Sequence, residues 1–512
     1  MDAKALEIGV DGKQKPDSKE GMGDPQALFI DGSYCSSLDG ATFSVTNPMT
    51  GKHLYECASA STDDYARAIQ CASIAFNSWS RSSPSSRRLI FLKAADILEA
   101  YLDGDAPAIL SAEVSATTSW VRVNILATVG ILRETAGLVT HIKGEIVPAD
   151  RPGTTILIER EPLGVVFAIS PWNAPVNLTA RAVATPLICG NTVILKPSEF
   201  SPKSQHLLVR ALHAAGLPPG CLNFLPVSPS QTPVVTEYAV KHPSIRHVNF
   251  TGSDRVGRII AGWAATCLKR CVLELGGKAP VIVLEDANLE DAVEAVIFGA
   301  LANAGQICMS TERVLLHSSI AKSFKNILLR RIEGIKVGNH EEDSTVSMSG
   351  LFCPASADRV QTLLNEAIKS GAKLLYGDTS VSGPNSTIMG PHIIDGITPD
   401  MEIFHKESFG PLICLCSFET DEEAIGLANG TDFSLCAAVF SQDIMRALEV
   451  ARRVKAGSCH INGPTVYIEA TLPNGGVGGS SGYGRFGGIA GVYEFTEPKI
   501  ISLGKSGMKY SF

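Results

Sequence analysis

A glutamate and a cysteine, each placed among small residues, are the two side chains of this sequence best suited to covalent chemistry. Glu274 stands in the segment LELGGK at residues 273–278, and Cys308 follows 34 residues later in the segment NAGQICMST at residues 303–311. A cysteine thiolate is a strong nucleophile. A carboxylate within its reach can take the thiol proton or activate a water molecule. The pair therefore predicts a covalent mechanism that passes through a thioester.

Most of the other cysteines are expected to be small core residues rather than functional groups. The chain has 13 cysteines, and they are scattered singly along it. The closest pairs, Cys267 with Cys271 and Cys414 with Cys416, lack CxxC spacing, and no histidine cluster stands beside them. We therefore expect reduced thiols in a cytoplasmic protein, and no metal site.

The composition limits the class of protein. The chain has 512 residues, of which 45% are hydrophobic and 19% are charged, with a formal net charge of −8. These values suit a globular protein of about two to four domains with a sizeable core. The acidic balance argues against nucleic-acid binding and against an anionic membrane surface. The N-terminus lacks the apolar core of a secretory signal, and no run of about 20 apolar residues predicts a membrane-spanning helix.

The chain begins with a polar segment and continues with a helical opening third. Residues 1–24 are polar and rich in charge and glycine, as in a disordered tail. A small hairpin is expected, with residues 28–30 as its first strand, Asp31-Gly32 as its turn and an alternating second strand that continues through residues 42–45. A helix is expected over residues 62–79, with Ser61 or Thr62 as its N-cap. Further helices are expected at 85–102 and 119–142.

Two stretches in which strand and helix patterns alternate make up the rest of the chain. This alternation is typical of doubly wound parallel sheets. The expected strands of the first stretch are 155–161, 165–169, 192–195, 222–225, 247–250 and 272–274. Those of the second stretch are 280–284, 314–316, 412–417 and 437–440. The expected helices are 204–215, 288–299, 319–335, 358–370 and 421–429, with one more before residue 187.

Six short motifs occur along these two stretches. They are PWNAP at 171–175, GNTVILKPSE at 190–199, FTGS at 250–253 followed by Gly257, ELGGK at 274–278, GQIC at 305–308 and ESFGP at 407–411. Any one of them alone is a weak signal. In this order and spacing they resemble the motifs of the aldehyde dehydrogenase superfamily, and the resemblance covers nearly the whole chain.

The resemblance implies an α/β fold with a Rossmann-type NAD-binding domain, an α/β catalytic domain and a small β oligomerisation arm. The implied boundaries are 25–143 with 163–276 for the NAD-binding domain, 277–475 for the catalytic domain, and 144–162 with 489–512 for the arm. In the arm, the strand near 155–161 and the segment 499–503 would pair with a partner subunit. We therefore expect a homodimer or a homotetramer.

The resemblance also assigns the catalytic roles. Cys308 would attack an aldehyde, and the Asn173 side-chain amide together with the backbone N–H of Cys308 would stabilise the resulting oxyanion. A nicotinamide cofactor would take a hydride and leave a thioester, and Glu274 would activate the water that hydrolyses it. Family members that pass the acyl group to coenzyme A typically lack this glutamate. Its presence therefore favours release of a free acid.

Eight residues are implied to bind the cofactor, which we expect to be NAD rather than NADP. They are Trp172, Lys196, Glu199, Gly252, Ser253, Gly257, Glu407 and Phe409. Lys196 and Glu199 would contact the adenosine ribose, where a carboxylate repels a 2′-phosphate. Ser253, together with the tryptophan, would approach the pyrophosphate at a helix start. Glu407 and Phe409 would contact the nicotinamide ribose and ring.

Two late segments resemble the salicylaldehyde and vanillin dehydrogenase branch, whose members oxidise aromatic aldehydes. They are GSCHINGPTV at residues 457–466 and GSSGYGRFGG at residues 479–488. Arg181, eight residues after Asn173, is hypothesised to point into the substrate tunnel and to meet a phenol or carboxyl oxygen. The alternative is an arginine that holds its helix to a neighbour.

The sequence between these two segments departs from that branch. Tyr467-Ile468-Glu469 stands in place of the usual His-Asp-Glu, and Gly478 stands in place of a usual lysine. Pro473-Asn474 precedes the late Gly-Gly, where a phenylalanine is usual. These positions are expected to line or support the substrate entrance. A bulky, specialised substrate such as a polyketide-type aromatic aldehyde therefore stays open, as does an aliphatic aldehyde or a semialdehyde.

Two hypotheses from other classes explain less of the sequence. A non-catalytic protein that keeps this fold would have no use for Cys308, Glu274 and Asn173 together. A thiol hydrolase that acts on esters without a cofactor would leave Lys196 and Phe409 unexplained.

Overall fold

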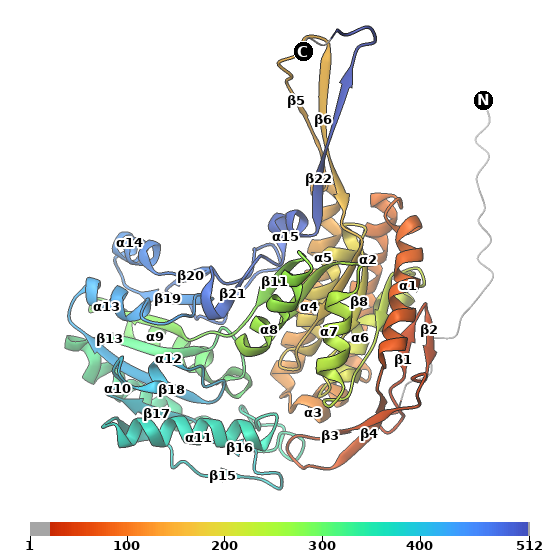
Figure 1. Ribbon diagram of the computed structural model, residues 1–512. Helices are drawn as coiled ribbons and strands as arrows, with labels where there is room; N and C mark the ends of the chain where they lie inside the picture. Colours follow the sequence, from red (N-terminus) through yellow and green to blue (C-terminus); the bar gives the residue numbers. More distant parts are fainter. Residues whose placement is uncertain (1–20, 510–512) are drawn as a thin grey trace, which may run out of the picture.

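Two large sheets and a small three-stranded sheet form the frame of the molecule (Figure 1). The computed structural model describes residues 21–509. The predicted disordered tail, residues 1–24, therefore lies almost entirely outside the described residues. The two large sheets correspond to the two stretches of alternating strands and helices, and the small sheet extends away from them (Figure 1).

The first large sheet has eight strands in the order β2-β1-β9-β8-β7-β10-β11-β21. Its five central strands, from β9 to β11, run parallel, and β1, β2 and β21 run antiparallel to their neighbours. Every residue of β7 and β8 is buried, as expected for apolar parallel strands that are covered on both faces. The strands are β1 (Leu28–Ile30), β2 (Ser33–Cys35), β7 (Val165–Ile169), β8 (Thr192–Lys196), β9 (Leu222–Phe224), β10 (Ile245–Thr251), β11 (Arg270–Glu274) and β21 (Gly482–Tyr483).

Helices cover both faces of this sheet, so that it carries two cores. Val166 and Ala168 of β7 pack with helices α2 to α6, whereas Phe167 between them packs with helices α1, α7 and α8. This alternation is the two-residue period of a strand. The helices are α1 (Thr62–Trp79), α2 (Pro84–Ala100), α3 (Ala106–Val114), α4 (Thr118–Gly137), α5 (Pro175–Ile188), α6 (Pro202–Ala214), α7 (Thr232–Lys241) and α8 (Asp254–Thr266).

The second large sheet has seven strands in the order β14-β17-β18-β13-β12-β19-β20, and all but β14 run parallel. These strands are β12 (Ala279–Val283), β13 (Thr311–His317), β14 (Lys373–Tyr376), β17 (His392–Asp395), β18 (Leu412–Phe418), β19 (Cys436–Phe440) and β20 (Ser458–Ile461). The helices that accompany it are α9 (Leu289–Leu301), α10 (Ser318–Ile332), α11 (Pro354–Lys369), α12 (Glu402–His405), α13 (Asp421–Ala428) and α14 (Ile444–Arg453). It too has a core on each face. The expected α/β fold with two mostly parallel sheets is therefore confirmed.

The small sheet is the predicted β arm, which extends from the body in Figure 1. It has the order β22-β6-β5, with β5 (Glu145–Val147), β6 (Thr154–Pro162) and β22 (Thr496–Gly504). β22 pairs antiparallel with β6 over their full length. The expected strand near 155–161 and the expected strand at 499–503 are thus neighbours within one chain. Helix α15 (Gly488–Glu494) leads into the arm.

Two details of the predicted organisation need correction. The expected hairpin is confirmed in its first strand and its Asp31-Gly32 turn, because β1 pairs with β2 across that turn. Its expected continuation through residues 42–45 is wrong, because β3 (Thr42–Thr46) pairs with β4 (His53–Ala58). Strand β21 lies in residues 476–488, which none of the predicted domains includes, and it extends the first sheet beside β11. The domain boundaries themselves stay a prediction. A last strand pair, β15 (Val381–Ser382) with β16 (Ile388–Met389), lies outside the large sheets.

One segment of the described residues, Thr118–His141, is long and apolar enough to cross a membrane by length and composition alone. Its most apolar window has a mean hydropathy of 1.2, and half of that window is buried inside the protein. The segment includes α4, which packs against α2 and α5. A helix from the core of a protein passes the same test, so the segment is weak evidence for a membrane span.

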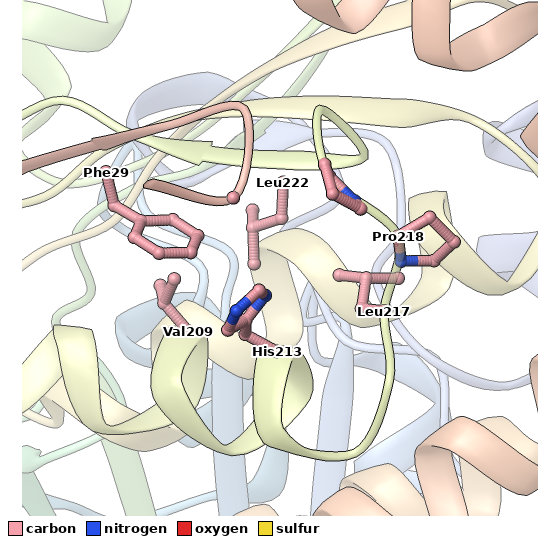
Figure 2. Close-up of a pocket in the computed structure, with 8 residues that line it drawn as sticks. Phe29, Val209, His213, Leu217, Pro218 and Leu222 are labelled. Carbon is pink, nitrogen blue, oxygen red and sulfur yellow. The ribbon is translucent and has the colours of Figure 1, made fainter. Parts of the chain in front are cut away.

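A small cavity lies between the β1–β2 hairpin and the end of α6 (Figure 2). Phe29 and His213 form one side with an edge-to-face ring contact at 5.1 Å, and Leu217 and Pro218 form the other. Its volume of about 10 Å³ is room for about one water molecule. This cavity therefore belongs to the packing of the first sheet.

Candidate active site

The Cys308 loop joins the end of α9 to the start of β13 and has an unusual backbone. Asn303, Ala304 and Gly305 follow one another with φ values of 51°, 54° and 74°, all in the left-handed region. A Cβ atom at Gly305 would lie 2.1 Å from the Gly410 carbonyl oxygen, so only glycine fits there. Such backbone strain is typical of functional sites. It turns the chain so that Cys308 reaches the first sheet.

Glu274 is the last residue of β11, and the turn that follows it lies directly against the Cys308 segment. A Cβ atom at Gly277 would lie 2.1 Å from the Cys308 carbonyl oxygen. The two backbones therefore approach as closely as a glycine allows. At this contact the Cys308 thiol donates a hydrogen bond to Glu274 Oε1, with an Sγ to Oε1 distance of 2.9 Å. The nucleophile and the base predicted from the sequence are thus direct neighbours.

The surroundings of the Cys308 thiol favour its protonated form. Cys308 keeps partial exposure, yet its surroundings are dense enough for burial to raise the pKa of the thiol well above its usual value. The Glu274 charge and hydrogen bond raise this pKa further, and Arg181 opposes them. The guanidinium of Arg181 approaches the carboxylate, with 3.7 Å between Nη1 and Glu274 Oε2. A proton transfer from thiol to carboxylate would therefore activate the nucleophile.

Asn173 lies in the turn between β7 and α5, and three hydrogen bonds fix it beside the Cys308 segment. Its side-chain Nδ2 donates to the Gln306 carbonyl at 3.0 Å. Its own carbonyl accepts from Trp120 Nε1 at 3.0 Å and from Asn303 Nδ2 at 3.2 Å. An amide nitrogen carries two donors, so the second N–H of Nδ2 is available to a ligand.

A cavity of about 720 Å³ opens at these residues. Its size is that of a small-molecule site. Asn173, Arg181 and Cys308 all line it. Apolar side chains make up much of the remaining wall, including Trp120, Leu178, Phe298, Leu301, Ile307, Val466, Ile468 and Phe486.

The segment that departs from the aromatic-aldehyde branch also reaches this cavity. Tyr467, Ile468, Glu469 and Asn474 line it, as expected. The Tyr467 hydroxyl donates to Glu469 Oε1 at 2.5 Å, and Tyr467 is 47% exposed. Gly478 stands outside the lining, with a left-handed φ of 112°. Tyr467 and Glu469 therefore form a polar, exposed part of the wall, whereas Asn474 is buried.

Three segments that carry predicted cofactor residues leave the carboxyl ends of parallel strands in the first sheet. Trp172 follows β7, Lys196 ends β8 and Ser253 follows β10. In open α/β sheets, ligands bind at this edge. Ser253 is the N-cap of α8, and its side chain makes no capping hydrogen bond. The first N–H groups of that helix are therefore oriented for an anion.

Close packing explains the glycines of the same motif. A Cβ atom at Gly257 would lie 2.5 Å from the Leu275 side chain, so this glycine lets α8 pack against the chain after β11. A Cβ atom at Gly252 would lie 2.5 Å from the Phe250 ring. The adenosine end of the predicted site holds a weak ion pair, since Lys196 Nζ lies 4.0 Å from Glu199 Oε2. Burial lowers the pKa of Lys196.

Aromatic rings cluster around Trp172 and Phe409, two of the predicted cofactor residues. Trp172 stacks on Phe352, with ring centroids 3.9 Å apart, and meets Phe409 edge-to-face at 5.9 Å. Phe200 meets Phe352 edge-to-face at 5.0 Å. Phe409 has a φ of 48°, which is rare for a residue with a side chain. The ring is therefore held in place by its surroundings.

A buried ion pair holds the turn that carries Glu407 and Phe409. Lys278 Nζ lies 2.6 Å from Glu312 Oε2, and the other carboxylate oxygen of Glu312 accepts from the Ser408 and Phe409 N–H groups at 2.8 and 3.1 Å. Glu407 Oε1 accepts from the Gly277 N–H at 2.9 Å. Burial raises the pKa of Glu407 to about 8.

Sequence reasoning missed several residues of the site. Glu312 and Phe352 were not singled out, and Trp120 was only part of a helix. One signal was present for Glu312, because Glu312-Arg313 places two charges at the start of a strand that is otherwise apolar. Buried charges are paired, so such a pair indicates a network. For Phe352 and Trp120 the sequence carried no such signal.

Comparisons with known proteins agree with this geometry. The profile described as aldehyde dehydrogenase family matches residues 34–501. The vanillin dehydrogenase of Pseudomonas sp. (strain HR199 / DSM 7063) is 43% identical over 476 residues, which cover 93% of this chain and 97% of the relative.

Solved structures are similar over the same range. A salicylaldehyde dehydrogenase from Pseudomonas putida G7, complexed with salicylaldehyde, matches with a TM-score of 0.93 at 40% identity. The match covers 95% of this chain and 100% of that one. An NAD-dependent aldehyde dehydrogenase from Sinorhizobium meliloti matches with a TM-score of 0.91 at 32% identity, covering 96% of both chains.

Proposed function

Because the chain belongs to the aldehyde dehydrogenase family, we propose that it oxidises an aromatic aldehyde to the carboxylic acid, with NAD as the hydride acceptor. The observation that carries this proposal is the Cys308 thiol, which donates to Glu274 at 2.9 Å beside a cavity of about 720 Å³. A nucleophile, a base and a small-molecule cavity meet at this point.

Cys308 would attack the aldehyde carbon after its proton passes to Glu274. The new C–S bond leaves a negative charge on the aldehyde oxygen. The second N–H of Asn173 Nδ2 and the backbone N–H of Cys308 are the donors that we assign to this oxyanion. NAD, when bound, accepts the hydride. Glu274 would release the thiol proton to solvent before deacylation. It would then take a proton from water as that water attacks the thioester carbon, and this proton returns to the Cys308 thiolate as the acid leaves.

The residues at the carboxyl edge of the first sheet fit a dinucleotide. We assign Lys196 and Glu199 to the adenosine ribose and the uncapped α8 N-terminus at Ser253 to the pyrophosphate. The buried lysine supports this role, since among residues 21–509 its ammonium contacts one carbonyl at 3.3 Å and a carboxylate at 4.0 Å. The Glu199 carboxylate would disfavour the 2′-phosphate of NADP.

The nicotinamide end is assigned to the aromatic rings and Glu407. Trp172 and Phe409, whose rings meet edge-to-face, would form an apolar corner that can contact a planar ring. The strained backbone of Phe409 supports a functional role for that position. Gly252 and Gly257, on either side of Ser253, are also assigned to the cofactor site, because a glycine lets neighbouring parts of the chain approach closely.

An aromatic substrate is supported by the apolar wall of the cavity and by the relatives. The similar proteins from Pseudomonas are named for vanillin and salicylaldehyde. Trp120, Phe298 and Ile307 offer contacts for a benzene ring. Arg181 lines the same cavity, and its contact with a substrate oxygen stays a prediction.

We further propose a cytoplasmic homodimer or homotetramer whose β arm meets a partner subunit. Large apolar side chains on the arm support this, since Ile146 and Ile500 are 76% and 71% exposed. The predicted division into an NAD-binding domain, a catalytic domain and the arm is proposed with it.

The experiment is NADH formation from a panel of aldehydes, with the Cys308→Ala variant as control. Hydroxylated and plain benzaldehydes should give NADH at the highest kcat/KM, and the variant should give none. Aliphatic aldehydes and semialdehydes test the alternative substrates. NADH from the variant would refute the covalent mechanism. If no aldehyde yields NADH with the unchanged protein, the proposed function is wrong.

A further inference from the structure

Glu274 and Arg181 face each other with one unsatisfied atom each. The Glu274 side chain is fully buried, with 0% exposure, and Arg181 is 9% exposed. Within the described residues, neither Glu274 Oε2 nor Arg181 Nη1 has a hydrogen-bond partner, and both atoms are closed to solvent. These two atoms lie 3.7 Å apart. The pair is therefore a close ion pair without a hydrogen bond.

A buried carboxylate needs this cation. Burial of an unpaired charge is strongly unfavourable, and an opposite charge within about 4–6 Å favours the ionised form. In the part of the chain that the structure describes, Arg181 is the one cation within 4.0 Å of Glu274. The other titratable groups that act on this site are the thiols of Cys308 and of Cys436 on β19. Both thiols become anionic on ionisation, so they oppose the Glu274 charge.

The absence of a hydrogen bond in the pair is also useful for a base. A bidentate arginine would occupy the carboxylate oxygens and restrict their movement. At 3.7 Å, the guanidinium supplies charge without fixing either carboxylate oxygen through a hydrogen bond, and Oε1 stays turned toward Cys308. Arg181 is held firmly for this purpose, because every residue of α5 except Asn177 is buried.

We propose that Arg181 is a positioning residue for Glu274: its charge balances the buried carboxylate and holds it in place to take a proton from the water that hydrolyses the thioester. In that step the water oxygen bonds to the thioester carbon and the C–S bond breaks with its electron pair on Cys308 Sγ. The proton taken by Glu274 returns to the thiolate. The inference rests on the proposed function and assigns Arg181 a role that does not depend on substituents of the substrate.

The test compares Arg181→Met and Arg181→Lys with the unchanged protein, using benzaldehyde, which has no oxygen besides its carbonyl. Rapid mixing measures the NADH burst of the first turnover, and the steady state measures kcat over a range of pH. In Arg181→Met we expect a retained burst, a kcat lower by about tenfold or more, and an ascending limb of kcat shifted to higher pH. Arg181→Lys should restore part of the kcat and part of the shift.

Two further variants guard against a merely structural effect. Arg133→Met removes an exposed arginine of α4 that pairs with Asp96 and Glu99, and it should change neither the burst nor the pH profile. In a Glu274→Gln background, Arg181→Met should have no additional effect on deacylation. If Arg181→Met does not fold, Arg181→Gln and Arg181→Lys supply the same comparison, with thermal unfolding as the check.

Three results would overturn the inference. The first is an unchanged ratio of burst to steady state together with an unchanged pH profile. The second is an equal additional loss from Arg181→Met in the Glu274→Gln background. The third is a rise in KM confined to hydroxylated or carboxylated aldehydes, which would make Arg181 a substrate contact only. Failure of the proposed function looks different, because the unchanged protein would then form no NADH.

Discussion

At the scale of single residues, the contact between Cys308 and Glu274 makes the thiol less acidic. Burial and the Glu274 charge both raise the pKa of Cys308, and Arg181 lowers it. The thiolate is therefore scarce near neutral pH until its proton moves to the carboxylate. The first prediction tests this electrostatic coupling without any substrate.

Replacing Glu274 by glutamine should make Cys308 more reactive toward iodoacetamide. The substitution removes a negative charge 2.9 Å from the sulfur, which lowers the pKa of the thiol, so that thiolate forms at lower pH. Alkylation of the Cys308 peptide at pH 8, followed by mass spectrometry, should be about tenfold faster or more. Cys35, on the opposite edge strand β2, is the internal control. Slower alkylation of Cys308 in the variant would contradict the prediction.

Glu407 gives a second prediction, on the pH dependence of NAD binding. Burial and Glu312 raise the pKa of Glu407 to about 8, while the Gly277 N–H, Arg359 and Lys278 lower it. Below this pH the carboxyl is protonated, and above it the ionised form accepts ribose hydroxyl donors more strongly. NAD affinity should therefore rise with pH.

Calorimetry between pH 6.5 and 8.5 should show the Kd for NAD falling by about fivefold, the difference between a neutral and a charge-assisted hydrogen bond. Glu407→Gln should remove this dependence. Glu407→Gln leaves Lys196 unchanged. The difference between the two plots of Kd against pH therefore isolates the contribution of Glu407. Parallel plots of Kd against pH for the two proteins would refute the assignment of Glu407 to NAD binding.

The reacting side chains could be predicted from sequence, whereas their supports could not. Cys308 and Glu274 stand in motifs with recognisable residue types, and the structure brings them into contact. Trp120 holds Asn173 through an indole hydrogen bond from a helix 53 residues earlier in the chain. A contact of this kind leaves no local pattern, because its partners are set by packing.

At the scale of elements, the first sheet delivers its part of the site by a general rule. Trp172, Lys196, Ser253 and Glu274 all stand at or just after the carboxyl ends of parallel strands, where open α/β sheets bind ligands. The placement of these four residues can therefore be predicted from the expected strands alone. Cys308 obeys no such rule, since it precedes β13 and reaches the site through three left-handed residues.

A third prediction concerns this loop. Gly305→Ala should lower the stability of the protein by about 2–6 kcal/mol, because it adds left-handed strain and overpacking against the Gly410 carbonyl. The matched control is Gly216→Ala. Gly216 has a φ of 100°, but nothing lies within 4 Å of its added Cβ, so only the strain of about 1–3 kcal/mol remains.

Thermal and denaturant unfolding measure both variants, and the NADH burst measures the site. Gly305→Ala should lose most of its activity, whereas Gly216→Ala should keep it. Equal loss of stability in the two variants would show that the close approach at Gly305 is relieved by movement of the neighbouring chain.

Short elements account for most of the errors at this scale. Strand β21 has two residues, Gly482 and Tyr483, too few for any alternation to be visible. It exists because Gly482 can lie against the Leu273 carbonyl. The error in the length of the expected hairpin has a similar cause, since its second strand, β2, has only three residues and ends well before residues 42–45.

At the scale of the whole molecule, the site lies where the two sheets meet. β11 ends at Glu274 and β12 begins at Ala279, so a four-residue turn connects them. The glycines of this turn touch both Cys308 and Glu407. Any movement of one sheet relative to the other would therefore change the distance between thiol and carboxylate. The order of the elements could be predicted from sequence, but this contact depends on how the two sheets pack.

The β arm gives the last prediction. β22 and β6 pair over nine residues and expose Ile500 and Leu503 at 71% and 52%, more apolar surface than an isolated arm would keep in water. In the proposed homo-oligomer a partner subunit covers these side chains. The double variant Ile500→Glu with Leu503→Glu would place two charges in that contact, and their burial is unfavourable. Light scattering after gel filtration should then show the monomer mass of 54.2 kDa in place of an oligomer.

The control for this experiment is Met445→Glu on α14, which changes an equally exposed apolar side chain, at 72%, away from the arm. It should leave the oligomer intact. The NADH burst of the arm variant separates assembly from chemistry, because Cys308, Glu274 and Asn173 all come from one chain. A burst without the oligomer would show that each protomer holds a complete site. An unchanged mass in the arm variant would move the interface to another surface.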